Sequence, residues 1–226
     1  MKKKIFIIGI GGLTGSKLVE IAKKDFEIFG SYNYRDPKSA IQKNTKLDIS
    51  NSTKIKEILE EIKPDVVINT AGINNVDYCE KNPDIALKIN IQAVKEICQI
   101  TKELGIKFVQ LSSDSVFDGT KQLPYEEIDE TESINYYGKT KIESEKIVLE
   151  NPNNVVVRAS VLYGYLPHNL AKIESSSKKS INFGQWLINK LSINEKVRII
   201  TDEYSSPIIA DDFARSILHI IKYEGN

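Results

Sequence analysis

Hydrophobic residues in this chain fall into two alternating patterns. Short apolar runs are separated by segments whose apolar residues recur at intervals of three and four, the period of an amphipathic helix. The clearest helical segment carries Ile55, Ile58, Leu59 and Ile62, begins at the capping residues Ser50–Ser52 and ends before Pro64. The apolar runs predict strands at Lys4–Ile8, Phe26–Ser31, Val66–Asn69, Phe108–Ser112 and Val155–Arg158. Strands that alternate with helices predict right-handed βαβ units, and therefore an α/β fold with a Rossmann-type, doubly wound parallel sheet.

The later helices follow from the same pattern. One helix begins at Pro83 and ends at Leu104 before Gly105, and another runs from about Tyr137 to Glu150 before Asn151-Pro152. After Gly164 the regular alternation stops. Residues Leu166–Asn182 predict a flexible loop, and the remainder predicts a helix, a strand and a helix at Phe183–Leu191, Val197–Ile200 and Asp211–Tyr223.

Composition narrows the classes of partner. The 226 residues include 31 basic and 31 acidic residues, so the formal charge is zero and nothing favours a nucleic acid or an anionic membrane surface. Met1–Lys4 leads directly into the short apolar run Ile5–Ile8, which is too short for a signal sequence or a membrane span. Cys79 and Cys98 are few and far apart, which favours reduced thiols in a cytoplasmic protein. No cluster has the spacing of metal ligands, so no metal is expected.

A glycine-rich loop lies between the first strand and the first helix. Gly9, Gly12 and Gly15 have the spacing G-x-x-G-x-x-G. Glycines in such a loop permit a tight turn, let the backbone approach a pyrophosphate and allow close packing of helix on strand. The phosphates of a dinucleotide would lie at the helix N-terminus, where N–H groups and the helix dipole favour negative charge. We therefore expect Gly9, Gly12, Leu13 and Gly15 to bind a nicotinamide dinucleotide.

The segment after the second strand bears on which dinucleotide binds. An acidic residue there favours NAD, whereas a basic one accommodates the 2′-phosphate of NADP. The sequence is Ser31-Tyr-Asn-Tyr-Arg-Asp36, in which Arg35 suits a phosphate and Asp36 suits a ribose. NADP(H) is favoured and NAD(H) stays open, with Tyr34 and Arg35 expected at the edge of the cofactor.

Two tyrosines have a lysine four residues later, namely Tyr34–Lys38 and Tyr137–Lys141. About one such pair is expected by chance in a chain with 10 tyrosines and this lysine content, so context must decide between them. Residues four apart share one helical face, and Tyr137–Lys141 falls in a predicted helix. A nearby ammonium would lower the pKa of the phenol and make it a better acid or base.

Further segments complete a longer pattern. They are Asp48–Ser50, Pro64–Gly72, Val76–Glu80, Asn90, Leu111–Gly119, Asn135–Glu143, Arg158–Gly164 and Ser206–Ala214. In this order they resemble the dTDP-4-dehydrorhamnose reductase family of the extended short-chain dehydrogenase/reductase superfamily, over nearly the whole chain. The resemblance implies a nucleotide-sugar substrate, a nicotinamide cofactor and a catalytic triad.

The resemblance also implies roles for single residues. Ser113 would hydrogen-bond the substrate carbonyl, Tyr137 would donate the proton, and Lys141 would bind the nicotinamide ribose and lower the tyrosine pKa. Further cofactor contacts are implied for Asp48, Ile49, Ala71, Gly72, Asn90, Tyr137 and Lys141. Substrate contacts are implied for Asp114, Ser115, Val161 and Tyr163. Arg158 suits either an ion pair or a phosphate contact.

Three features depart from the family pattern. Ser115 stands where the family commonly has tyrosine, and Val161 where it commonly has tryptophan. Ser115 also replaces the glutamate of nucleotide-sugar dehydratases, which disfavours elimination. Family members continue well past the Ser206–Ala214 segment, whereas this sequence stops at Asn226, so we expect a substrate lobe that is reduced or truncated.

The sequence therefore predicts an NAD(P)H-dependent reductase of a 4-keto nucleotide sugar, most simply one that converts dTDP-4-dehydrorhamnose to dTDP-rhamnose. Residues 1–160 would form the NAD(P)-binding domain with the catalytic residues, and residues 161–226 a mixed segment that contributes the substrate lobe. One alternative is a non-catalytic NADP-binding protein similar to the regulatory subunit of methionine adenosyltransferase. Another is an epimerase that retains NAD. A homodimer through the helices at Asp84–Leu104 and Tyr137–Glu150 would fit the superfamily.

Overall fold

The computed structural model describes residues 2–38, 41–166, 168–171, 173, 175 and 182–222. Its centre is a six-stranded parallel sheet with the order β3-β2-β1-β4-β5-β6. The strands are β1 (Lys4–Ile8), β2 (Glu27–Tyr32), β3 (Lys43–Lys46), β4 (Val66–Asn69), β5 (Lys107–Ser113) and β6 (Val155–Ala159). The chain winds outward from β1 to β3 and then returns to place β4 on the other side of β1. The doubly wound parallel sheet predicted from the sequence is confirmed.

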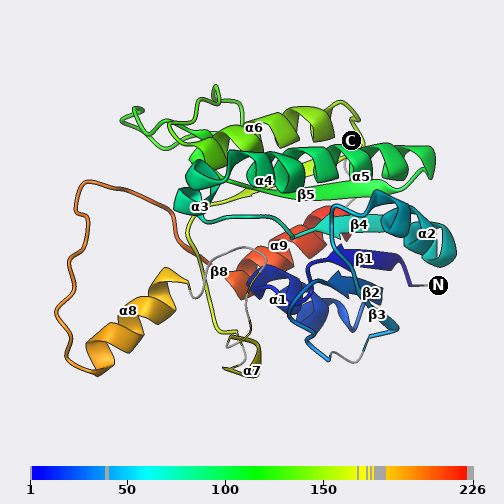
Figure 1. Ribbon diagram of the computed structural model, residues 1–226, viewed down its shortest axis with the longest axis horizontal. Coiled ribbons are helices and arrows are strands. Elements are labelled where there is room, and N and C mark those ends of the chain that lie inside the picture. Colours follow the sequence, from blue (N-terminus) through cyan, green and yellow to red (C-terminus); the bar gives the residue numbers. More distant parts are fainter. Residues whose placement is uncertain are drawn as a thin grey trace.

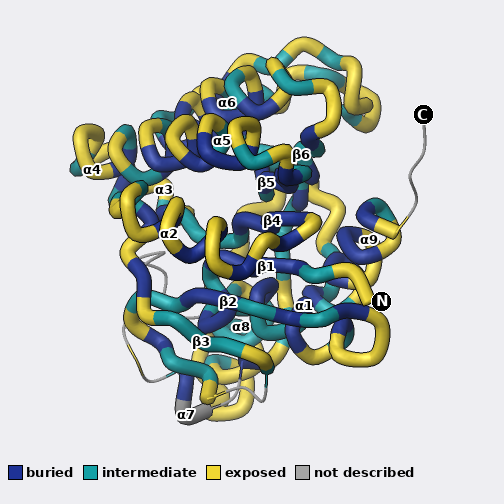
Figure 2. The backbone as a smooth tube through the Cα atoms, turned by 90° about the vertical axis from the view of Figure 1, so that its right-hand side faces the viewer, coloured by how far each residue is buried: buried dark blue, intermediate teal, exposed yellow. Residues whose placement is uncertain are grey.

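Helices cover both faces of this sheet (Figure 1). On one face α1 (Leu13–Ala22) and α9 (Ala210–Lys222) lie together against Ile5, Ile7 and Val109. On the other face α2 (Ser52–Ile62), α5 (Ala93–Glu103) and α6 (Tyr136–Leu149) bury their apolar sides against alternate strand residues, including Phe6 and Phe108. Figure 2 shows β1 and β4 as the buried middle layer, with the exposed turns of the helices outside. Both cores therefore depend on the strands that also carry the site.

The capping residues explain where the helices begin and end. Asn51 accepts a hydrogen bond from the backbone N of Lys54 at 3.0 Å, and Lys63 ends α2 in a left-handed conformation, directly before Pro64. The stretch predicted as one helix from Pro83 consists of α4 (Pro83–Leu87), a π-helical turn η1 (Lys88–Gln92) and α5. A short helix, α3 (Val76–Lys81), was not predicted because its single turn and a half carries no clear apolar repeat.

The part of the chain after Gly164 differs most from the prediction. The predicted strand at Val197–Ile200 is wrong: these residues have no regular structure, and Ile199 and Ile200 are exposed. The strand in this region is β8 (Ile208–Ile209), which pairs in parallel with β7 (Leu162–Tyr163). Within Leu166–Asn182, predicted as a loop, the structure describes α7 (His168–Ala171) and a few single residues, and the rest lies outside the described residues, as does Tyr223.

Helix α8 (Phe183–Ser192) stands apart from the two layers around the sheet (Figure 1). None of its residues is buried, and Phe183, Ile188 and Leu191 are exposed. No helix in the described part of the chain is long and apolar enough to cross a bilayer.

Candidate active site

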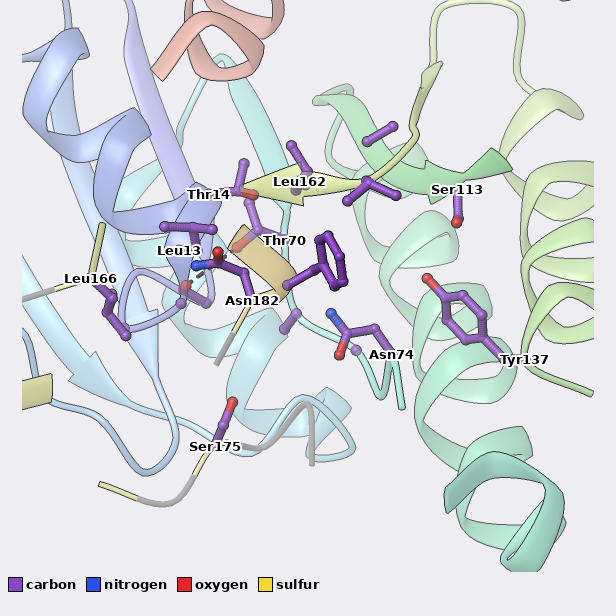
Figure 3. A pocket seen from close by; sticks show the side chains of 18 of the residues that line it. Leu13, Thr14, Thr70, Asn74, Ser113, Tyr137, Leu162, Leu166, Ser175 and Asn182 are labelled. Carbon is purple, nitrogen blue, oxygen red and sulfur yellow. Dashed lines mark hydrogen bonds between the residues drawn. The ribbon is translucent and has the colours of Figure 1, made fainter. Parts of the chain in front are cut away.

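A cavity of about 400 Å³ lies at the carboxyl ends of the central strands. Most of the residues around it come from the loops after β1, β2 and β4, from the end of β5, from the segment after β6, and from α6 and α8. In Figure 3, Leu13, Thr14 and Thr70 lie at one end of it, and Ser113 and Tyr137 lie at the other. Ligands of open parallel sheets bind at this edge, where the strand order reverses, and here the reversal lies between β1 and β4.

The glycine loop shapes one end of the cavity. Gly9 has a φ of +96°, and a Cβ there would lie 2.7 Å from the Thr70 hydroxyl oxygen. A Cβ on Gly15 would lie 2.2 Å from the Gly9 carbonyl oxygen, so only a glycine here lets α1 pack this closely on the loop. Gly12 is the N-cap of α1 and offers no side chain to the first N–H groups of the helix. Those groups therefore suit an anion such as a phosphate.

The opposite end presents two hydroxyl groups. Figure 3 shows the Ser113 hydroxyl and the Tyr137 phenol directed toward each other, one from the end of β5 and the other from the first turn of α6. Asn135 caps this helix by accepting a hydrogen bond from the Gly138 backbone N at 2.8 Å. Gly138 brings α6 so close that a Cβ would lie 2.0 Å from the Ser115 carbonyl oxygen. Close approach of the helix thus sets the position of Tyr137.

A chain of oxygen atoms surrounds Ser113. Its hydroxyl lies 3.0 Å from a carboxylate oxygen of Asp114 and 3.2 Å from the hydroxyl of Ser115. The other carboxylate oxygen of Asp114 accepts a hydrogen bond from Ser160 at 2.5 Å, and Ser160 in turn accepts one from the backbone N of Ser206 at 3.2 Å. Asp114 thereby holds Ser113 and fixes the segment after β6 to the end of β5.

Lys141 lies behind the two hydroxyl groups. Its ammonium donates a hydrogen bond to the Leu111 carbonyl oxygen at 3.0 Å and lies 5.8 Å from the centroid of the Tyr137 ring. Burial lowers the pKa of Lys141 to about 8, and the negative charge of Glu145 partly opposes this shift. The side chain is 7% exposed. It therefore keeps most of its charge at neutral pH while nearly removed from water.

The expected lowering of the tyrosine pKa is wrong for this structure. Burial raises the pKa of the Tyr137 phenol, and although a hydrogen bond with Ser113 lowers it, the charges of Asp114 and Cys79 raise it further. The phenol is therefore neutral at physiological pH and holds a proton that it can donate.

The sequence-predicted cofactor residues divide into two groups. Those that line the cavity are Gly9, Gly12, Leu13, Tyr34, Arg35, Ala71, Gly72 and Tyr137. Asp48 instead accepts hydrogen bonds from the N and the hydroxyl of Ser50, and Ile49 belongs to the buried core. Neither Asp48 nor Ile49 lines this cavity, nor do Gly15, Asn90 and Lys141.

Two predicted polar contacts have protein partners in the structure. Arg35 is buried, and its Nε donates to the Ile173 carbonyl oxygen at 2.8 Å. Asn90 holds both backbone groups of Ile73 and donates to the Thr140 hydroxyl at 3.1 Å, so it joins the loop after β4 to α6. Asn90 acts on the site through these elements.

The substrate end contains most of the residues predicted for it. Asp114, Ser115 and Val161 line the cavity, whereas the partly exposed Tyr163 does not. Arg158 does not face the cavity, because its guanidinium pairs with Glu145 at 2.7 Å. The question that the sequence left open for Arg158 is answered in favour of an ion pair.

Several cavity residues were not predicted. Gly11 is a fourth glycine of the loop, and a Cβ there would lie 2.1 Å from the Arg35 carbonyl oxygen. The adjacent Gly11-Gly12 pair was a signal for it. Thr70, Asn182, Phe183 and Gln185 also line the cavity. No local pattern marks Asn182 or α8, since only the tertiary fold brings them to the glycine loop.

Two observations test whether a nicotinamide dinucleotide suits this cavity. Uncapped N–H groups at the start of α1 provide for the phosphates. Ser112, on β5 beside Ser113, lines the cavity, and its hydroxyl is a buried oxygen without a partner in the described residues. The residues present fit the group.

A glycine loop after β1, a serine and a tyrosine at the far end of the same cavity, and a buried lysine beside that tyrosine together define an oxidoreductase of the extended short-chain dehydrogenase/reductase type. Comparison with known proteins agrees. The family model described as the RmlD substrate binding domain matches residues 2–226. The chain belongs to this family, that of the dTDP-4-dehydrorhamnose reductases, and the family expected from the sequence is confirmed.

Three relatives illustrate the likeness. A probable low-salt glycan biosynthesis reductase, Agl14 of Haloferax volcanii, is 30% identical over 218 residues, 96% of this chain and 70% of the relative. The dTDP-4-dehydrorhamnose reductase of Salmonella typhimurium is 31% identical over 176 residues, 77% of this chain and 54% of that enzyme. Among solved structures, the Bacillus anthracis dTDP-4-dehydrorhamnose reductase in complex with NADP has 28% sequence identity to this chain and a TM-score of 0.81. The match covers 99% of this chain and 72% of that enzyme. The match thus spans about half to three quarters of each relative.

Proposed function

We propose that this protein reduces the keto group of a 4-keto nucleotide sugar with NAD(P)H, most simply dTDP-4-dehydrorhamnose to dTDP-rhamnose. The observation that carries the proposal is the pair of hydroxyl groups, Ser113 and Tyr137, at the opposite end of the cavity from the glycine loop. Relatives named as dTDP-4-dehydrorhamnose reductases, one of them bound to NADP, support this substrate class. The cofactor would bind within residues 1–160, and residues 161–226 would contribute to the substrate side.

Each of the three residues has a role in this reaction. Ser113 donates a hydrogen bond to the carbonyl oxygen of the sugar, where negative charge develops. Tyr137, neutral because burial raises its pKa, gives its proton to that oxygen. Lys141 would hold the nicotinamide ribose with its ammonium. The bound dinucleotide supplies a hydride to the carbonyl carbon, so the products are an alcohol and the oxidised dinucleotide.

Arg35 supports NADP as the preferred dinucleotide. It lines the cavity beside the glycine loop, and the Gly11 backbone lies against its carbonyl group. The Nε of Arg35 is taken by the Ile173 carbonyl oxygen, so its terminal Nη groups would be the ones that pair with a 2′-phosphate. The neighbouring Asp36 accepts a hydrogen bond from the backbone N of Lys38 at 2.8 Å. This carboxylate oxygen is therefore already engaged in a local turn.

Cofactor oxidation tests the proposal. The purified protein is mixed with NADPH or NADH and a panel of 4-keto nucleotide sugars, and the fall in cofactor absorbance is followed. We expect oxidation of NADPH with a 4-keto sugar carried on dTDP. Binding of NADP without any turnover would favour the regulatory role instead. Release of NAD from the purified protein, with sugar interconversion and no net oxidation, would favour an epimerase.

A further inference from the structure

Two buried amide side chains lie in the sheet beneath the cavity. Asn69 on β4 and Gln110 on β5 are direct neighbours in the parallel register, and they are 0% and 1% exposed. Their surroundings along the strands are apolar, with Val67, Ile68 and Val109 all fully buried. A buried amide destabilises a protein unless it is hydrogen-bonded, so the partners of this pair show what it holds.

The hydrogen bonds of the pair form a continuous chain across the two strands. The backbone N of Ala71, on the cavity wall, donates to Asn69 Oδ1 at 3.0 Å. Asn69 Nδ2 donates to Gln110 Oε1 at 2.8 Å. Gln110 Nε2 then donates to the Leu111 carbonyl oxygen at 2.8 Å.

The chain ends at the lysine of the site. The Leu111 carbonyl oxygen that accepts from Gln110 also accepts from the Lys141 ammonium at 3.0 Å. Within the described residues this carbonyl is the hydrogen-bond acceptor of the ammonium. The Lys141 side chain is long and could rotate, but a carbonyl held between Gln110 and its own strand gives the ammonium a fixed anchor.

A pair of apolar side chains could fill the same place in the sheet without needing partners. The amides instead connect the loop at Ala71 to the ammonium of Lys141. We propose that Gln110, oriented by Asn69, is a positioning residue that fixes the Leu111 carbonyl and through it the Lys141 ammonium. This inference rests on the proposed function, because it assumes that Lys141 contacts the dinucleotide.

A double-mutant cycle on cofactor affinity tests this role. The dissociation constant of NADP⁺ is measured by titration calorimetry for the wild type, Gln110→Met, Lys141→Met and the double variant. We expect Gln110→Met to weaken binding about fivefold to tenfold, and to weaken it no further once Lys141 is already methionine. A residue with a purely structural role would instead give independent, additive effects.

The matched control is Thr101→Val. Thr101 is fully buried, and its hydroxyl donates to the Ile97 carbonyl oxygen within α5, away from the ammonium of Lys141. This variant also loses a buried hydrogen bond, but it should bind NADP⁺ as the wild type does. Should Gln110→Met not fold, Gln110→Asn keeps an amide that is one methylene too short to reach both partners, and the same weakening is expected.

Two results would overturn the inference. One is an affinity of Gln110→Met, or of its Gln110→Asn substitute, equal to that of Thr101→Val. The other is full additivity with Lys141→Met. Because the cycle measures binding alone, it stands even if the wild type reduces no sugar, and so the failure of the proposed function is seen separately from the failure of the positioning role.

Discussion

The ion pair of Arg158 and Glu145 offers the sharpest test of the energetics of this fold. Arg158 on β6 donates from Nε at 3.0 Å and from Nη2 at 2.7 Å to the Glu145 carboxylate on α6. It also donates to the Glu127 carbonyl oxygen and lies 5.2 Å from the centroid of the Phe117 ring. The perturbation is Arg158→Met, which keeps an unbranched apolar side chain and removes the charge.

The magnitude follows from burial. The Glu145 side chain is 5% exposed and the Arg158 side chain 22% exposed. Removing one partner of a buried pair leaves an uncompensated charge and costs about 3 to 5 kcal/mol. Because Arg158 is partly exposed, we expect the lower end, about 3 kcal/mol. For a chain of this length that lowers the melting temperature by about 6 to 12 °C.

Thermal and urea unfolding of three variants would measure this. The exposed pair Lys54–Glu57, whose side chains are 52% and 57% exposed, supplies the control Lys54→Met, which should be nearly as stable as the wild type. The double variant Arg158→Met/Glu145→Met should recover part of the loss, because the unpaired carboxylate is removed while the buried Lys141 ammonium loses the neighbouring charge of Glu145. A loss in Arg158→Met no larger than in the control, or a double variant less stable than the single one, would refute the reasoning.

Four further predictions concern the site. Tyr137→Phe should leave NADP⁺ affinity unchanged and lower turnover by about a thousandfold, because the proton donor is lost. The neighbouring variant Tyr136→Phe should retain activity. Equal turnover of the two variants would contradict the role of Tyr137 as proton donor. Since the pKa of Lys141 is lowered to about 8, turnover should decline above that pH as the ammonium is lost. Between about pH 8 and pH 10.5 the Lys141 amine keeps its proton only in the unfolded chain, so the stability of the wild type relative to Lys141→Met should rise with pH. A fall in this relative stability would contradict the lowered pKa of Lys141. Gly15→Ala should weaken NADP⁺ binding about tenfold by calorimetry, because its Cβ would lie 2.2 Å from a backbone oxygen of the glycine loop. The control Gly105→Ala, whose Cβ would meet open space, should bind NADP⁺ as the wild type does.

The sheet could be predicted from the sequence because its strands are continuous apolar runs. β1 and β4 are buried on both faces, and β4 was predicted with the bounds that it has. The edge strand β3 (Lys43–Lys46) consists of the polar sequence Lys-Asn-Thr-Lys, which carries no such signal. The false strand at Val197–Ile200 shows the opposite case, since Ile199 and Ile200 are exposed and the segment pairs with no strand in the described residues.

The site could be predicted in part for a similar reason. The glycine loop and the Tyr137–Lys141 spacing are local patterns, so sequence alone placed them on the right elements. The direction of the Tyr137 pKa shift could not be foreseen, because it depends on how deeply α6 buries the phenol. The link from Asn69 through Gln110 to Lys141 was also hidden, since it runs across two strands and a helix.

The order of strands has a consequence for the nascent chain. β1 lies between β2 and β4, yet β4 ends at Asn69 and is synthesised much later. At about 5 to 20 residues per second, the apolar strand Ile5–Ile8 waits about 3 to 12 seconds for that neighbour. An unpaired apolar strand edge is a place where chains aggregate. Lys2, Lys3 and Lys4 directly precede it, and we expect their mutual repulsion to keep newly made chains apart until β4 arrives.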